Sequence, residues 1–174
     1  MIERMVLALT LCLAAALAHA YGDEDRDWGI VASSDIRQAP YSAPTPMQVP
    51  GARVIRTDDL KSLSAAAPRP LLIDVAAGEG HVSLQGAVWL PNAGRGVNYL
   101  DTLQGALGEQ LATLTGGNKA VPLVFFCVNS QCWLSYNASM RAAALGYSEV
   151  YWYRGGIEAW RAAGLPLANL GQSR

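Results

Sequence analysis

Histidine is scarce in this sequence of 174 residues, which contains only His19 and His81. A zinc site built on three histidine side chains is therefore excluded, and we expect no metal site. Charge is also sparse, with 13 Lys and Arg against 14 Asp and Glu and a formal net charge of -1. Proteins that bind nucleic acid usually carry a basic excess, so we expect no nucleic-acid partner.

Long apolar runs are confined to the start of the chain. Residues 6–18 are an uncharged, apolar run, and the segment ends in Ala18-His19-Ala20. This run is shorter than the roughly 20 residues that span a bilayer, and a small-x-small ending is typical of a cleaved secretory signal. We therefore predict a signal peptide over residues 1–20, a periplasmic protein, and no stable membrane span after cleavage.

Cysteine is rare as well, and only Cys127 and Cys132 follow the predicted signal peptide. In an oxidising compartment a close pair of this kind tends to form a disulfide. Trp133 stands where a c-type haem site needs histidine. The same stretch lacks the arginine that a cysteine-dependent phosphatase places at the far end of its loop.

The rest of the chain divides by composition. Residues 21–51 are rich in proline and have no regular period, which predicts an extended arm that packs on the domain through Trp28 and Tyr41. Residues 52–170 form the predicted domain, and residues 171–174 a tail. The apolar patterns of the domain predict five strands, at 52–55, 71–75, 87–90, 122–127 and 150–153. They also predict four helices, at 58–63, 99–114, 135–145 and 156–163. Thr57 and Asn98 are the expected N-caps of the first two helices.

Strands that alternate with helices indicate an α/β fold, here a single three-layer domain with a central parallel sheet and helices on both faces. Ligands in such sheets lie beyond the carboxyl ends of the strands. Cys127 occupies such an end, in a loop that opens a helix, where inward-pointing N–H groups and the helix dipole favour a thiolate. The expected substrate-binding loop comprises Val128, Asn129, Ser130, Gln131, Trp133 and Ser135.

Three chemical readings of this loop stay open. Cys127 can attack sulfur and carry a persulfide, it can cycle with Cys132 between dithiol and disulfide, or the pair can form a purely structural bridge. Asp74, Arg95 and Arg141 are the predicted supporting residues, with Asp74 as a carboxylate that ties loops together. His81 is expected on the surface, and Trp133 either covers the thiol, docks a partner or belongs to the core.

The chain resembles the rhodaneses between about Val54 and Leu167. An ordered set of segments carries the resemblance, at residues 72–75, 86–91, 123–127, 142–147 and 155–160, with a closing Gly-Leu-Pro at 164–166. It implies a rhodanese-like three-layer domain in which Cys127 carries persulfide sulfur and Ser135 begins the helix. The loop differs from the usual pattern because it has no arginine or glycine.

A narrower resemblance is to exported rhodanese-like proteins called PQQ-dependent catabolism-associated CXXCW motif proteins. The arm, the Leu-Thr-Gly-Gly-x-Lys stretch at 114–119 and the pair Cys132-Trp133 carry it. It implies a link to periplasmic alcohol oxidation, with a quinoprotein dehydrogenase, its electron carrier or a transport component as partner. PQQ is implied only for those partners, and no cofactor is predicted in this chain. The alternative function is a non-catalytic, disulfide-locked accessory module for that system.

Overall fold

A computed structural model describes residues 20–170. The predicted signal peptide, except for its last residue, and the predicted tail at 171–174 lie outside the described residues. Within the described part of the chain, none of the helices has the length and apolar character needed to cross a membrane.

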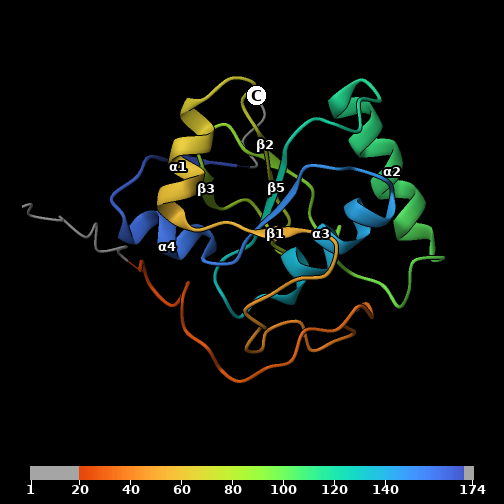
Figure 1. Ribbon diagram of the computed structural model, residues 1–174, viewed down its shortest axis with the longest axis horizontal. Coiled ribbons are helices and arrows are strands. Elements are labelled where there is room, and N and C mark those ends of the chain that lie inside the picture. The colour runs from red at the N-terminus through yellow and green to blue at the C-terminus, as the bar shows by residue number, and fades with distance from the viewer. Residues whose placement is uncertain (1–19, 171–174) are drawn as a thin grey trace, which may run out of the picture.

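A five-stranded parallel sheet forms the centre of the domain (Figure 1). The strand order is β1-β6-β5-β2-β4. These strands are β1 (Arg53–Val54), β2 (Leu71–Asp74), β4 (Val88–Trp89), β5 (Leu123–Phe126) and β6 (Val150–Tyr153). The central strand β5 pairs with β2 on one side and β6 on the other, so its four residues are all buried. The predicted parallel α/β sheet is confirmed.

Helices cover both faces of this sheet because β5 is apolar toward both. Leu123 and Phe125 pack toward α2 (Thr102–Thr115) and α3 (Trp133–Ala144). Val124 and Phe126 pack on the opposite face, toward α1 (Thr57–Ala65) and α4 (Gly156–Ala162). Figure 1 shows these two pairs of helices on opposite sides of the strands. The predicted three-layer arrangement is therefore confirmed.

The predicted start of α2 is wrong by one turn. The N-cap is Asp101, whose carboxylate accepts a hydrogen bond from the Gln104 N–H. Asn98 instead accepts a hydrogen bond from the Leu100 N–H within a preceding turn, and Leu100 is 95% exposed. Both Asn and Asp are good caps, and the tertiary contacts of Asp101 select the later one.

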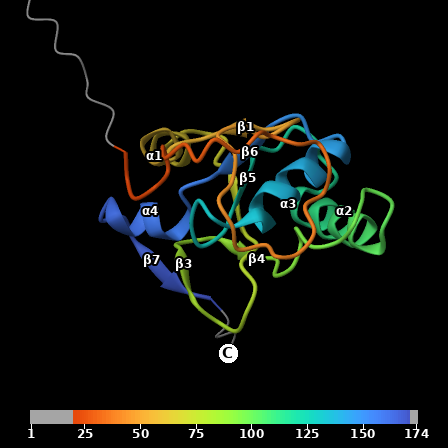
Figure 2. The same ribbon diagram turned by 90° about the horizontal axis from the view of Figure 1, so that it is seen from below.

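Two further details differ from the sequence expectations. The N-cap of α1 is Arg56, and Thr57 is the first helical residue, buried against Glu24 of the arm. Strands β3 (Val82–Leu84) and β7 (Leu167–Asn169) form a separate antiparallel pair beneath α4 that the sequence patterns did not predict (Figure 2). Each is only three residues long, too short for a period of two to be recognised.

The arm packs along the domain (Figures 1 and 2). Its residues Ile36 and Val49 join a buried cluster with Trp133, Tyr136 and Trp152, and Tyr41 packs against that cluster. This bears out the expected contact through Tyr41.

A second anchor of the arm is Arg154, which follows β6 and is 1% exposed. Its guanidinium donates to the carbonyl oxygens of Asp23, Glu24, Arg26 and Thr45. It also stacks over the ring of Trp28, 4.8 Å from the ring centre, as the sequence led us to expect for that tryptophan. A buried cation with many carbonyl partners holds the arm in place.

Candidate functional site

The two cysteines form a disulfide at the carboxyl end of the central strand. Cys127 directly follows β5, and Cys132 is the N-cap residue of α3. The Sγ atoms are 2.07 Å apart and the Cα atoms 6.2 Å apart. The expected pairing of these cysteines is confirmed, and the bridge lies where ligands bind in open α/β sheets.

Backbone contacts with helix α4 fix the Cys127 end of the loop. The N–H groups of Ile157 and Glu158, at the start of α4, donate to the carbonyl oxygens of Cys127 (3.0 Å) and Val128 (2.9 Å). Gly156 permits this approach, because a Cβ atom there would lie 2.3 Å from the Cys127 carbonyl oxygen. A glycine is required at that contact, also because its φ is +60°.

The arm fixes the other end of the loop. Tyr41 accepts a hydrogen bond from the Trp133 N–H, and the Ala43 N–H donates to the Gln131 carbonyl, both at 2.9 Å. Thr45 donates its hydroxyl to the Ser130 carbonyl at 2.6 Å. Arg154 in turn donates its Nε–H to the Thr45 hydroxyl, which connects the arm anchor to the cysteine loop.

An open cavity of about 420 Å³ lies over the disulfide. Both cysteines line it, together with Tyr41, Ser42, Ala77, Val128, Asn129, Gln131 and Leu134. None of these described lining residues is an arginine or a lysine, so the lining itself offers no charged donor for an anion. Cys127 is only 3% exposed, whereas Cys132 is partly exposed.

Three predicted loop residues have structural partners. Ser130 is buried and held by Thr45, and Trp133 is buried, with its indole N–H donating to the Pro44 carbonyl. The expected role of Ser135 as the helix cap is wrong, because α3 begins at Trp133 and Ser135 is its third residue. Its hydroxyl donates to the Cys132 carbonyl and accepts from the Trp152 indole N–H. Ser135 therefore ties the start of α3 to the sheet.

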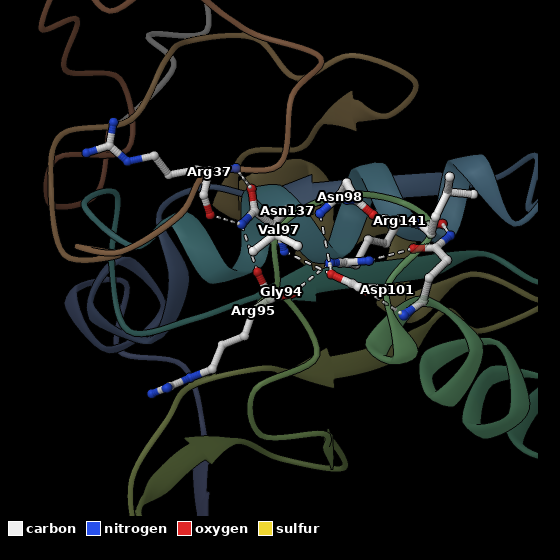
Figure 3. A network of polar contacts seen from close by, with 10 residues as sticks. Arg37, Gly94, Arg95, Val97, Asn98, Asp101, Asn137 and Arg141 are labelled. Atoms are coloured by element: carbon white, nitrogen blue, oxygen red, sulfur yellow. Dashed lines mark hydrogen bonds and ion pairs between the residues drawn. The ribbon is translucent and has the colours of Figure 1, made fainter.

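The two predicted supporting arginines lie in different places. Arg141 is fully buried in the last turn of α3 and donates to Asp101, Gln104 and the Arg95 carbonyl. Figure 3 shows Arg141 facing Asp101, while the side chain of Arg95 points away from this network. The Arg95 guanidinium lies 5.7 Å from the centre of the Tyr41 ring, which lines the cavity. Arg95 is therefore a neighbour of the cavity wall, and Arg141 is not one of the lining residues.

Asp101 is the anionic partner of this network. Partial burial of its carboxyl group favours the neutral form, but hydrogen bonds from Arg141 and from the Val97 and Gln104 N–H groups, with the charge of Arg141, lower its pKa to about 2. The carboxylate is thus ionised at neutral pH. The ion pair, with an N–O distance of 2.7 Å, attaches the loop before α2 to α3.

Asp74 ties loops together, as the sequence led us to expect. It is fully buried and accepts hydrogen bonds from the Ala76 N–H and the Ser83 hydroxyl. His81 was expected on the surface, and that expectation is wrong. Its Nε2 lies 2.7 Å from the Asp74 carboxylate, and its side chain is 23% exposed. Asp74 belongs to the face opposite Cys127, because Ile73 and Val75 pack on the α3 side.

Among residues 20–170, no cluster of three or more His, Cys, Asp and Glu side chains is arranged to hold a metal ion. The cysteine loop therefore offers two sulfur atoms beside a cavity whose lining has no arginine or lysine.

The family model for the Rhodanese-like domain matches residues 56–163. The chain belongs to this family. A search of curated protein sequences finds no match.

Several solved structures are similar to this chain. An EanB variant in complex with ergothioneine covalently linked with a persulfide is 17% identical, with a TM-score of 0.51, over 70% of this chain and 32% of that one. Thiosulfate sulfurtransferase from Pseudomonas aeruginosa is 27% identical, with a TM-score of 0.49, over 74% of this chain and 21% of that one. The rhodanese-like domain of an Anabaena sp. protein is 21% identical, with a TM-score of 0.48, over 69% of this chain and 81% of that one.

The arm residues at the site were not predicted from the sequence. Tyr41, Ser42 and Thr45 contact or line the cysteine loop, although they lie about 85 to 90 residues before it and outside the matched family segment. The available signal was the cluster of prolines, which indicates an extended segment but not the surface on which it packs.

Proposed function

We propose that this protein is an exported rhodanese-like thiol protein in which Cys127, once reduced, accepts sulfane sulfur and Cys132 is its redox partner. The observation that carries the proposal is the Cys127–Cys132 disulfide in the wall of an open cavity at the carboxyl end of the sheet. A disulfide beside a cavity is accessible to small thiols, which a buried structural bridge is not.

Sulfur uptake starts from the dithiol form. The Cys127 thiolate attacks the outer sulfur of a persulfide donor, R–S–SH, and the thiolate R–S⁻ leaves. The product is a persulfide on Cys127, so no external oxidant is needed. The cavity lining has no arginine or lysine to bind a compact dianion such as thiosulfate, which favours an organic persulfide as the donor.

Intact-mass measurement of the Cys132→Ser variant tests this step. Reduced and desalted variant is mixed with glutathione persulfide, and we expect a mass gain of one sulfur atom that cyanide removes. The matched Cys127→Ser variant should gain no sulfur under the same conditions. Equal sulfur uptake by both variants would assign the carrier role to neither cysteine and overturn the proposal.

The setting in which we place this chemistry is the periplasm, in association with PQQ-dependent alcohol catabolism. The apolar start of the chain and the Cys132-Trp133 pair support that setting. Fractionation of the native host should then yield the protein in the periplasmic extract, with the intact mass of a chain that starts near Tyr21. Recovery of the full-length chain from the cytoplasm would contradict it.

The second candidate is an accessory module that keeps its disulfide closed and binds a component of the quinoprotein dehydrogenase system. The lack of arginine and lysine in the cavity lining favours it, because an anionic substrate then has no charged partner there. Crosslinking in periplasmic extract should capture a dehydrogenase, its electron carrier or a transport component with both wild type and Cys127→Ser. Loss of the crosslink in the variant would count against a role independent of the thiol.

A further inference from the structure

We propose that Cys132 resolves a persulfide on Cys127 within the same loop, so that the protein releases hydrogen sulfide instead of storing sulfur for delivery. This inference rests on the proposed uptake of sulfur by Cys127. It assigns the fate of that sulfur, and it makes the protein a persulfide reductase that needs an external dithiol to complete each cycle.

The resolving step balances without any further reactant. The Cys132 thiolate attacks Cys127 Sγ, which is the inner sulfur of the Cys127–S–SH group. The sulfur–sulfur bond of the persulfide breaks, HS⁻ leaves, and the Cys127–Cys132 disulfide forms. Cys132 Sγ is oxidised to the disulfide level and the outer, sulfane sulfur is reduced to sulfide, while Cys127 Sγ keeps its oxidation level. An external dithiol, for example a thioredoxin-like protein, then reduces the disulfide.

Main-chain contacts keep the two cysteines close when the disulfide opens. The Cys127 carbonyl is held by the Ile157 N–H at 3.0 Å, and Trp133, next to Cys132, is held by the Tyr41 carbonyl at 2.9 Å. The Thr45 hydroxyl holds the middle of the loop through the Ser130 carbonyl. None of these hydrogen bonds involves a sulfur atom, so reduction of the bridge leaves them in place. The attacking thiolate thus has a high effective concentration at Cys127.

The surroundings also disfavour the stored persulfide. None of the described residues lining the cavity is an arginine or lysine that would stabilise a persulfide anion. Cys127 is 3% exposed, which hinders direct transfer of its sulfur to a protein acceptor. The cavity of about 420 Å³ is open, so a small sulfide ion can leave. Retention and delivery are therefore both less favourable than release.

A single-turnover experiment tests the inference. Reduced, desalted wild-type protein is mixed with one equivalent of glutathione persulfide, and free sulfide and intact mass are followed together. We expect one sulfide per chain, a product two hydrogens lighter than the dithiol, and no lasting mass gain. The Cys132→Ser variant should keep the added sulfur and release no sulfide above the background of the donor.

The concentration dependence is a second readout that needs no variant. Resolution within one loop predicts that sulfide release after uptake has a first-order rate constant that is unchanged when the protein concentration is raised tenfold. An observed rate constant that rises in proportion to the protein concentration would mean that a second molecule resolves the persulfide, and it would overturn the inference.

The outcomes separate this inference from the proposed function. Wild type that keeps the added sulfur and releases no sulfide would overturn the resolving role and leave Cys127 as a sulfur carrier. Absence of uptake by Cys132→Ser, together with absence of sulfide from wild type, would overturn both.

Discussion

The two ends of helix α3 (Trp133–Ala144) lie in opposite surroundings, one beside an open cavity and the other in a buried ion pair. At its start, Cys132 lies beside an open cavity whose described lining has no arginine or lysine. In its last turn, Arg141 is fully buried and paired with Asp101. The disulfide thus lies at the open end, whose lining has no arginine or lysine, and the buried ion pair lies at the closed end.

This difference shows what the two buried arginines, Arg141 and Arg154, do. Arg141 holds the loop before α2, and Arg154 holds the arm through four carbonyl groups. Both are at most 1% exposed, so neither guanidinium is presented to solvent as an anion-binding group. These two buried cations stabilise the frame around the cysteine loop.

The largest effect that we predict concerns the closed end of α3. Asp101→Asn keeps a good helix cap but removes the charge that neutralises buried Arg141, so we expect a loss of about 3 kcal/mol in the free energy of unfolding. Chemical denaturation measures it. The control is Glu149→Gln, which breaks an exposed ion pair with Arg53, where the side chains are 41% and 56% exposed. That change should cost less than about 1 kcal/mol, and equal losses in the two variants would remove the distinction between buried and exposed pairs.

The next effect concerns the open end of α3, where the arm holds the loop. Thr45→Val removes the hydroxyl that donates to Ser130 and accepts from Arg154, and should lower the free energy of unfolding by about 1–3 kcal/mol. The loosened loop should also let dithiothreitol reduce the disulfide faster, which a quenched alkylation time course records.

A matched control separates these two consequences. Thr57→Val removes another buried arm contact, since the Thr57 hydroxyl has Glu24 and Tyr153 as its hydrogen-bond partners and not a residue of the cysteine loop. It should reduce stability by a similar amount without changing the reduction rate, and Thr45→Ser should restore the wild-type rate. An unchanged rate in Thr45→Val would mean that the arm does not position the loop.

The core of the fold was predictable from sequence because local pattern and final burial agree. Residues 123–126 are apolar toward both faces, and they became the central strand. Cys127 follows that strand, so its place at the carboxyl end of the sheet followed from the strand itself. Its pairing with Cys132 followed from their short separation.

The remaining features depend on contacts between distant segments. Nothing near Thr45 or Tyr41 in the sequence indicates that they contact residues 130–133. Asp101 displaced Asn98 as the cap of α2 because Arg141, forty residues later, holds its carboxylate. Propensity alone carries no information on such long-range partners.

The smallest effect that we predict is the acid sensitivity of the closed end. The pKa of Asp101 is about 2 in the folded protein and near its usual value of about 4 in the unfolded chain. The ionised carboxylate therefore contributes stability above about pH 4, and that contribution is lost as the pH falls toward about 2. Between about pH 4 and pH 3 we expect a loss of about 1 kcal/mol, which is the first part of the contribution that Asp101→Asn removes altogether. Unfolding free energies of wild type and Asp101→Asn, measured at several acidic pH values, should converge by that amount. A constant difference between the two proteins down to the lowest pH would mean that the carboxyl group at this end does not titrate, and that shape alone, without charge, holds Arg141 in place.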